Sequence, residues 1–339
     1  MKPPVFLLIL LILMALLVPA SASARSDLQE VREIHYQMGT LLDITIWHPN
    51  PETGRAMIRR SVREIHRLEG ILSNYDPQSS ISVLNRQAGH GKTKIQPELH
   101  RLLAMTIRFG RKTSGYFDVT VGPLMDLWQK QAERAYLPDH HTLARTLSLV
   151  GYGKLRLYPH GEAELLRKGM RIDLGGIGKG YAVDRVVWQL RQAGVKSALI
   201  NFGGSSIYAI GSPPGQESWE IGLKGIDGKL AGFLLLRDQA LSTSGSMGHF
   251  WIIQGKRYGH LINPHNGHPV TKPRMATVVA PTATEAEALT KPLVLLGENA
   301  ALLIKAFPQK RALLTLENGK LVFLDRTFSD KLWQPIQTP

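Results

Sequence analysis

The chain has 339 residues, of which 43% are hydrophobic and 20% are charged, a composition typical of a globular protein and not of a disordered or fibrous one. It contains 41 Lys and Arg against 27 Asp and Glu, which gives a formal net charge of +14, and it has no cysteine. The lack of cysteine excludes disulfides, thiolate zinc sites, iron–sulfur clusters, a cysteine nucleophile and a lipid-modified cysteine anchor.

The first 24 residues have the pattern of a secretory signal peptide. Lys2 provides a positive start, Val5 to Val18 form an apolar run, and Ala22-Ser23-Ala24 is a small-x-small cleavage site. The run is shorter than the roughly 20 apolar residues of a membrane span, although an uncleaved anchor helix is the alternative. We therefore expect a signal peptide over residues 1–24, a single mature domain over residues 25–339 and a periplasmic location.

The basic residues are distributed along the chain rather than gathered in one tract. Arg59, Arg63 and Arg67, for example, recur at the spacing of a solvated helix face. A surface that docks a negatively charged partner is the alternative interpretation. Because we expect an exported protein, we expect no nucleic-acid partner.

The first half of the chain predicts a strand and two helices. Apolar and polar residues alternate from Leu42 to Ile46, and a turn around residues 49–51 follows. From Arg55 to Ser73 the apolar residues recur every three or four positions, which indicates an amphipathic helix. A second helix is expected from Pro97 to about Arg111, with Pro97 in its first turn.

The second half alternates between strand and helix patterns. We expect helices over Gly180–Gln192 and Glu285–Leu296, and strands or strand-rich segments over Met170–Leu174, Ser197–Phe202, 218–250 (a β-meander) and Thr277–Ala280. No internal repeat is evident. The mixed order with long strand-rich stretches favours an α+β fold.

Three glycine-bearing segments are candidates for ligand binding: Asp173 to Asp184, Asn201 to Gly204 and Ser242 to Gly245. A strand that runs through glycines into a helix offers backbone N–H groups and a positive helix end to a phosphate, and Lys179 adds a charge. The spacing fits neither the P-loop nor the dinucleotide fingerprint, and glycines needed only for tight turns are the alternative. Asp173 could accept hydrogen bonds from a nucleoside or cap the helix.

Three histidines, His260, His265 and His268, lie in a turn-rich stretch. Their spacing suggests zinc, but the loop is broken by Pro and Gly and has no nearby acid to complete a site. His260 at the end of a strand, acting as a general base on a hydroxyl group, is the simpler interpretation.

Seven motifs in a fixed order carry a resemblance to a known family. They are Met38-Gly39-Thr40; Leu72 to Asp76 with Ser79 and Leu84-Asn85; Gly115 to Leu124 with Leu127-Trp128; Asp173 to Asp184; Asn201 to Gly204; Ser242 to Gly245; and His260 to Pro269. Over about Tyr36 to Gly297 the chain resembles the ApbE family of FAD:protein FMN transferases.

This resemblance implies a T-fold-like α+β architecture with mixed or antiparallel sheets and packed helices. It also implies an exported enzyme that binds FAD, cuts its pyrophosphate, attaches FMN by a phosphoester bond to a Thr or Ser hydroxyl of an acceptor protein, and releases AMP. The acceptors in the family are flavin-bearing subunits of membrane-associated electron-transfer systems, so we expect membrane association only through the partner. Such phosphoryl transfer depends on in-line positioning and on neutralised phosphate charge.

The resemblance also assigns roles to single residues. His260 matches the histidine proposed to activate the acceptor hydroxyl. The positions that match the family's FAD contacts are Met38, Tyr75, Tyr116, Phe117, Asp118, Asp173, Lys179 and Leu261.

The chain departs from the family where Mg²⁺ is bound. The family usually has Ala-Asp-Ala-Leu-x-Thr, whose Asp and Thr hold the ion together with a backbone carbonyl that falls near Gly176 here. This chain has Glu287 in place of the Asp and Lys291 in place of the Thr. An ammonium group cannot ligate a cation and repels it, and Thr290 lies one residue early, about 100° away around a helix.

This departure leaves three functions open. In the first, the Glu287–Lys291 pair places an ammonium where the metal would be and transfer proceeds with altered or no Mg²⁺ dependence. In the second, the chain is a periplasmic FAD-binding or delivery protein without transferase activity. In the third, it hydrolyses FAD to FMN and AMP. The pair could also be an ordinary exposed helix salt bridge. We expect transfer, because the chain retains His260, Asp118, Asp173 and Lys179.

Overall fold

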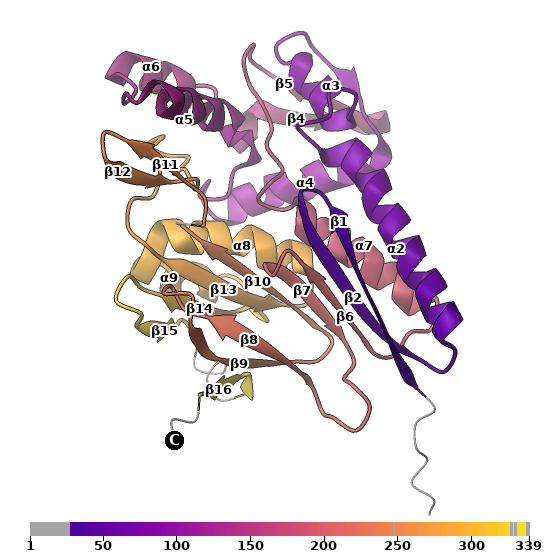
Figure 1. Ribbon diagram of the computed structural model, residues 1–339. Helices are drawn as coiled ribbons and strands as arrows, with labels where there is room; N and C mark the ends of the chain where they lie inside the picture. The colour runs from indigo at the N-terminus through magenta and orange to yellow at the C-terminus, as the bar shows by residue number, and fades with distance from the viewer. Residues whose placement is uncertain (1–27, 247, 326–327, 329–330, 337–339) are drawn as a thin grey trace, which may run out of the picture.

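The computed structural model describes residues 28–246, 248–325, 328 and 331–336, so the expected signal peptide lies outside the described residues. An eight-stranded antiparallel sheet forms the centre of the molecule (Figure 1). In spatial order its strands are β1 (Gln29–Gln37), β2 (Thr40–His48), β6 (Ala198–Phe202), β7 (Ser206–Ile210), β10 (Gln239–Gly245), β13 (Met275–Ala280), β14 (Arg311–Thr315) and β15 (Leu321–Phe323).

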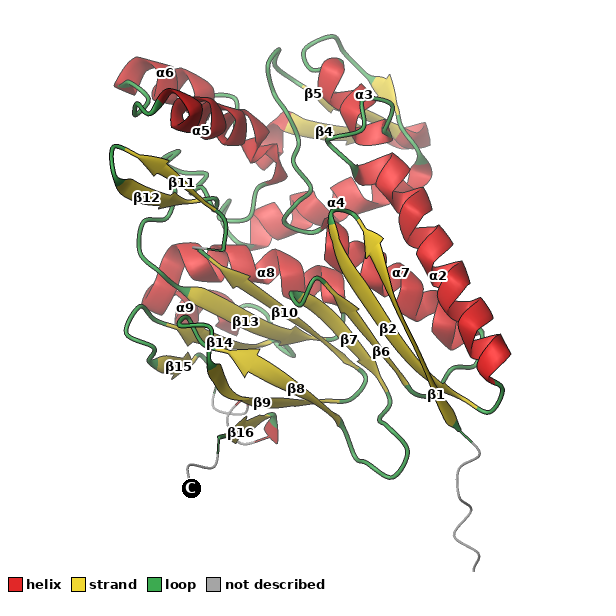
Figure 2. Cartoon of the chain, viewed as in Figure 1, coloured by secondary structure: helices red, strands yellow, loops and turns green. Residues whose placement is uncertain are grey.

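Three helices, α2 (Pro51–Leu72), α7 (Gly178–Gln192) and α8 (Ala283–Leu296), pack along one face of this sheet (Figure 2). The start of α2 follows from its sequence, because the Asn50 side chain accepts a hydrogen bond from the Thr53 backbone and a proline opens the first turn. A fourth helix, α4 (Pro97–Lys112), also contributes to the core on this side. These four helices confirm the helices predicted from apolar spacing, and α2 begins four residues earlier than predicted.

A smaller sheet covers part of the opposite face. It consists of β8 (Trp219–Lys224), β9 (Leu230–Leu236) and β16 (Trp333–Pro335), and it encloses a second apolar cluster that includes Trp219, Leu234 and Leu241. The prediction of a β-meander over residues 218–250 was wrong. After the β8–β9 hairpin the chain crosses to the large sheet, where β10 pairs with β7 and β13.

The remaining elements form lobes at the edge of the helical layer. One contains α3 (Ser80–Arg86) and a small sheet of β3 (Thr93–Lys94), β4 (Leu155–Tyr158) and β5 (Glu162–Leu165). The other contains α5 (Gly122–Arg134), α6 (His140–Leu147) and the hairpin β11 (Phe250–Ile253) and β12 (Lys256–Gly259). A short helix, α9 (Ala300–Lys305), follows α8. The Trp128 indole donates a hydrogen bond of 2.8 Å to the Gly267 carbonyl and so fixes the second lobe to the histidine-rich loop.

The segment Met170–Leu174 does not form a strand, so that prediction was wrong. The N–H and C=O groups of Ile172 bond to the side chain of Asn85, at 2.7 and 3.0 Å, and the Asp173 N–H donates to the Val119 carbonyl at 2.7 Å. An amide side chain and one loop carbonyl thus take the hydrogen bonds that a neighbouring strand would have formed.

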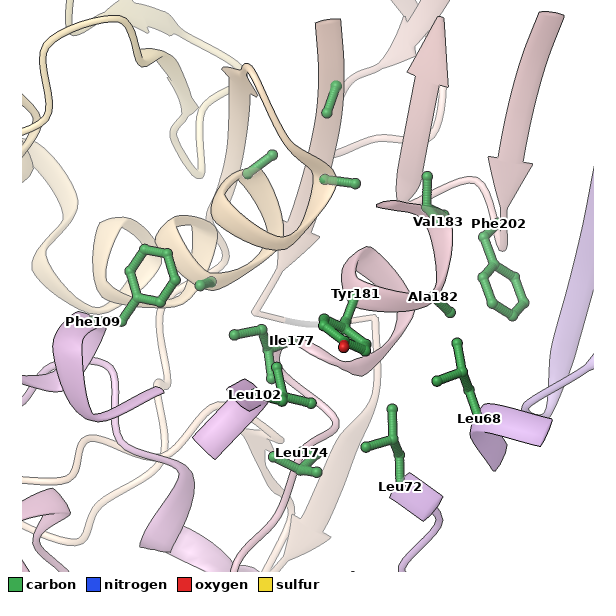
Figure 3. Packing of buried hydrophobic residues seen from close by; sticks show 14 of the residues in the cluster. Leu68, Leu72, Leu102, Phe109, Leu174, Ile177, Tyr181, Ala182, Val183 and Phe202 are labelled. Carbon is green, nitrogen blue, oxygen red and sulfur yellow. The ribbon is translucent and has the colours of Figure 1, made fainter. Parts of the chain in front are cut away.

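The main core lies between the large sheet and the helices. Figure 3 shows Ile177 and Tyr181, at the start of α7, among Leu68 of α2, Leu102 of α4 and Phe202 of β6. Ile177, Leu68, Leu102 and Phe202 are fully buried. The glycine-rich segment that enters α7 is therefore anchored by its apolar side chains. Among the described residues, no helix is both long and apolar enough to cross a membrane.

Candidate active site

The first turns of α7 and α8 lie against each other and build the centre of the candidate site. Asp184 of α7 accepts hydrogen bonds from the backbone N–H groups of Ala283 and Thr284, at 2.7 and 2.9 Å, and from the Thr284 hydroxyl. Gly180 permits this approach, because a β-carbon there would lie 2.4 Å from the Ala283 carbonyl oxygen. These hydrogen bonds cap the start of α8 and hold the helix with its inner face against the glycine-rich segment.

This contact makes a testable prediction. Gly180→Ala should lower the free energy of unfolding by about 1–3 kcal/mol through overpacking, and it should weaken FAD binding because α8 must shift. Gly178→Ala is the matched control, since a β-carbon at Gly178 meets nothing within 4 Å and alanine is the better helix former. Denaturant unfolding and FAD titration of both variants measure the difference. Equal behaviour of the two variants would contradict the role given to Gly180.

Glu287 of α8 is the buried centre of a charged cluster. Its carboxyl group accepts a hydrogen bond of 2.5 Å from the Gly180 N–H through Oε2. Its other oxygen, Oε1, lies 3.5 Å from Nζ of Lys179 and 3.7 Å from Nζ of Lys291. The Glu287 side chain is only 2% exposed. Two ammonium groups thus share one carboxylate oxygen beside the start of α7.

Lys291 lies along the glycine-rich segment. Its Nζ donates to the backbone carbonyl of Glu287 at 3.1 Å. A β-carbon at Gly176 would lie 3.4 Å from Cε of Lys291 and 3.7 Å from the ring of Phe117, so the lysine stem packs against the residue near which the sequence places a metal-binding carbonyl. Burial lowers the pKa of Lys291 to about 8, although Glu287 acts in the opposite direction.

The residues at this position do not fit a divalent cation. Mg²⁺ takes a near-octahedral set of oxygen ligands at about 2.0–2.1 Å, whereas both oxygens of Glu287 already face protein donors and an ammonium group has no lone pair. Thr290, the residue before Lys291, carries a hydroxyl group but is fully buried. Its hydroxyl bonds to Ser244 and to the Glu287 carbonyl, each at 2.7 Å. Within the described part of the chain, no three His, Asp or Glu side chains gather as a metal site would require.

His260 follows β12, and its ring orientation is set by the backbone. Nδ1 lies 2.9 Å from the His249 carbonyl; because a carbonyl only accepts, Nδ1 carries the proton and Nε2 of the neutral ring is left as the base. The preceding Gly259 has no room for a side chain, since a β-carbon would lie 2.1 Å from the Ser246 carbonyl oxygen. The ring of His265 instead packs 4.5 Å from that of Tyr116.

The two aspartates matched to FAD contacts differ in their exposure and in how many hydrogen bonds their carboxylates already accept within the protein. Asp118 is 8% exposed, and its carboxylate accepts hydrogen bonds from the N–H and hydroxyl of Thr120 and from the Tyr152 N–H. Burial raises the pKa of Asp118, and the residue holds the loop 117–120 in shape. Asp173 is 26% exposed; it accepts from the Gly175 N–H at 2.8 Å and lies 3.7 Å from Arg171.

The other positions matched to FAD contacts all lie in loops or turns. Met38 occupies the β1–β2 turn with a positive φ of 45°. Tyr75 is 98% exposed in the loop after α2. Phe117 is buried with its ring edge-on to Phe109. Leu261 is also buried, and its carbonyl accepts a hydrogen bond from Val270.

Sequence reasoning missed the role of Asn85, which it quoted only as part of a motif. The Asn85 side chain accepts a hydrogen bond from the Ile172 N–H and donates to the Ile172 carbonyl and, at 3.1 Å, to the Asn74 side chain. It therefore connects the loop that carries Tyr75 to the segment that carries Asp173. No spacing rule could have paired residues 87 positions apart.

Comparison with known proteins gives one consistent result. The model of the ApbE family matches residues 38–314. A protein of Treponema pallidum named FAD:protein FMN transferase is 29% identical over 317 residues, 86% of each chain, and one of Haemophilus influenzae with the same name is 31% identical over 244 residues, 68% of this chain and 70% of the relative.

Solved structures agree with these sequence matches. The crystal structure of the ApbE protein from Thermotoga maritima superposes with a TM-score of 0.80 at 26% identity and covers 89% of this chain and 98% of its own. The flavin transferase ApbE from Vibrio cholerae gives 0.79 at 23% identity, covering 89% and 99%. The predicted α+β architecture with antiparallel sheets and packed helices is confirmed.

Proposed function

The chain belongs to the ApbE family, and we propose that it is an FAD:protein FMN transferase, which cleaves FAD, attaches FMN to a hydroxyl of an acceptor protein and releases AMP. Relatives that align with most of the chain carry this activity in their names. The proposal rests mainly on the contacts of Glu287, whose carboxylate holds the ammonium groups of Lys179 and Lys291 beside the start of α7. Such a cationic cluster at a helix N-terminus suits the pyrophosphate of FAD.

The chemistry is a phosphoryl transfer. The oxygen of the acceptor Thr or Ser forms a bond to the phosphorus of FMN, while the bond from this phosphorus to the AMP oxygen breaks and AMP leaves with the electron pair. His260 takes the proton of the hydroxyl group at Nε2, which its hydrogen bond to the His249 carbonyl leaves free. The ammonium groups offset the charge on the phosphate oxygens.

The acceptor and the location complete the proposal. We propose that the acceptor is an exported or membrane-associated electron-transfer protein and that the enzyme itself acts in the periplasm. The apolar run from Val5 to Val18 with the small residues after it supports export. FAD and the acceptor are then the two partners of the enzyme, and contact with a membrane occurs only through the acceptor.

Counting AMP against modified acceptor tests the transfer reaction. The mature protein is incubated with FAD, with and without a periplasmic flavin-acceptor domain, and AMP is quantified by chromatography. Transfer predicts one AMP for each modified acceptor and little AMP without acceptor. AMP release that does not depend on the acceptor indicates FAD hydrolysis instead, and tight FAD binding without any AMP indicates a flavin-binding or delivery protein.

The pH dependence of transfer follows from the environment of His260. Burial lowers its pKa below the usual 6.5; the charges of His249, Lys291 and Lys179 act in the same direction, and the hydrogen bond to the His249 carbonyl acts against it. A lowered pKa keeps the ring neutral, and thus active as a base, to lower pH. We expect the acidic limb of kcat/KM for FAD, which reports the free enzyme, to lie below pH 6.5. A limb at or above this value would contradict the assignment.

A further inference from the structure

Two positive charges meet one negative charge in the candidate active site. Lys179 and Lys291 approach the same carboxylate oxygen of Glu287, at 3.5 and 3.7 Å. Since one carboxylate cannot neutralise two ammonium groups, the cluster keeps an excess positive charge next to the positive end of α7. Such an excess is costly in a buried position unless an anion balances it.

Both lysines keep access to a ligand. The side chains of Lys179 and Lys291 are 28% and 16% exposed, whereas Glu287 beneath them is 2% exposed. An ammonium group has three N–H donors, and Lys291 gives one of them to the Glu287 carbonyl. The carboxylate is thus more deeply buried than the two lysine side chains, which have donors left for a ligand.

We propose that the ammonium groups of Lys179 and Lys291 bind the pyrophosphate of FAD in place of a divalent cation, so that FMN transfer by this enzyme does not require Mg²⁺. This inference rests on the proposed function, which supplies the pyrophosphate. It follows from the donor set, because the position over Gly176 holds a lysine stem and the oxygens of Glu287 already face protein donors. A lysine binds phosphate as a compact point charge, which is the role the ion would otherwise have.

The lysines act in the bond-breaking step through their charge. As the bond between the FMN phosphorus and the AMP oxygen breaks, the electron pair stays on AMP and negative charge grows on its phosphate. Ammonium groups already fixed by Glu287 stabilise this charge without rearrangement. The proton of the acceptor hydroxyl goes to His260, so the lysines need to donate no proton.

Equilibrium binding of FAD tests the inference without any need for turnover. FAD affinity of the mature protein is measured by flavin fluorescence in EDTA and in Mg²⁺, for the wild type, Lys291→Met and Lys310→Met. Lys310, which precedes β14, is the matched control. Its side chain is 12% exposed, and its Nζ lies 3.0 Å from the carboxylate of Glu285, which is on α8 like Glu287. We expect equal wild-type affinity in both media, a loss of about tenfold to a hundredfold in Lys291→Met, and no loss in Lys310→Met. Tighter wild-type binding in Mg²⁺, or unchanged binding by Lys291→Met, would overturn the inference.

The transfer rate in EDTA separates this inference from the function on which it rests. We expect the wild type to modify its acceptor at the same rate, within about twofold, in EDTA and in Mg²⁺. Transfer that occurs only with Mg²⁺ overturns the inference and leaves the proposed function intact. No transfer in either medium counts against the proposed function, and the binding experiment then still decides the role of the lysines. The double variant Lys291→Thr, Glu287→Asp should acquire Mg²⁺-dependent FAD binding, and no gain would count against the placement of these residues.

Discussion

Replacing His260 with Gln should lower the rate of FMN transfer by about 10² to 10⁴, the usual contribution of a general base. The His249 carbonyl holds the ring through Nδ1, and in the proposed reaction Nε2 takes the proton of the acceptor hydroxyl. FAD affinity should change little, because the effect falls on the acceptor proton and not on the pyrophosphate. Single-turnover transfer, followed by the mass of the acceptor, measures the rate, and FAD titration measures the affinity.

A second histidine provides the control for this prediction. His268→Gln alters an exposed ring that lies 6.1 Å from the ring of Trp128 and outside the charged cluster. We expect its transfer rate to stay within about twofold of the wild type, a change too small to reflect a lost base. If the His260→Gln enzyme transfers FMN within tenfold of the wild-type rate, His260 is not the general base.

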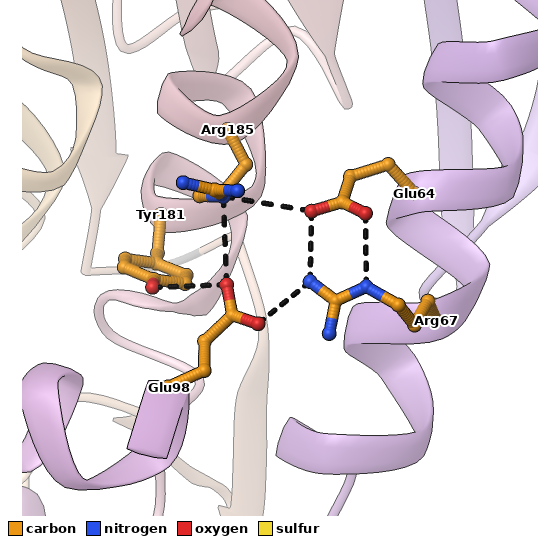
Figure 4. Close-up of polar contacts among 5 residues, drawn as sticks. All are labelled: Glu64, Arg67, Glu98, Tyr181 and Arg185. Carbon is orange, nitrogen blue, oxygen red and sulfur yellow. Dashed lines mark hydrogen bonds and ion pairs between the residues drawn. The ribbon is translucent and has the colours of Figure 1, made fainter. Parts of the chain in front are cut away.

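Removing the carboxylate of Glu98 should lower the free energy of unfolding by about 1–3 kcal/mol, since it takes one nearly buried carboxylate from a network whose two arginines are 45% and 31% exposed. Figure 4 shows this network between α2, α4 and α7. Glu98 accepts from Arg67 at 2.6 Å and from the Tyr181 hydroxyl at 3.1 Å, and it lies 3.4 Å from Arg185. Its side chain is 11% exposed. Glu98→Ala leaves two arginines to the single remaining carboxylate, Glu64.

An exposed ion pair in the first turn of α2 is the matched control. Glu52 lies 3.1 Å from Arg55 and its side chain is 77% exposed, so Glu52→Ala should cost less than about 1 kcal/mol. Denaturant unfolding of both variants gives the comparison. If Glu98→Ala costs no more than Glu52→Ala, the network does not hold the helices together as described.

The sequence could predict the helices because their signals are local. The apolar spacing of α2 and α4, and the prolines at their first turns, depend on neighbouring residues only. The strand predicted over Met170–Leu174 failed for the opposite reason. An alternating segment looks the same whether its backbone bonds to another strand or, as here, to the side chain of Asn85.

The site could be predicted in part for the same reason. Helical spacing correctly placed Lys291 beside Glu287 and put Thr290 on a different side of the helix from Lys291, where its hydroxyl bonds to Ser244. The contact of Glu287 with Gly180 spans 107 positions and that of Asp184 with Thr284 spans 100. Such long-range pairs depend on how α7 and α8 pack, which no local pattern encodes.

The intact mass of an acceptor domain shows whether this enzyme transfers FMN to a protein hydroxyl. The mature protein is mixed with FAD and a periplasmic flavin-acceptor domain that carries a free Thr or Ser hydroxyl, and the acceptor is weighed before and after. We expect the acceptor to gain the mass of one FMN less one water, and to gain nothing when FAD is omitted. An acceptor of unchanged mass, in the presence of enzyme that has bound FAD, would contradict the proposed transfer.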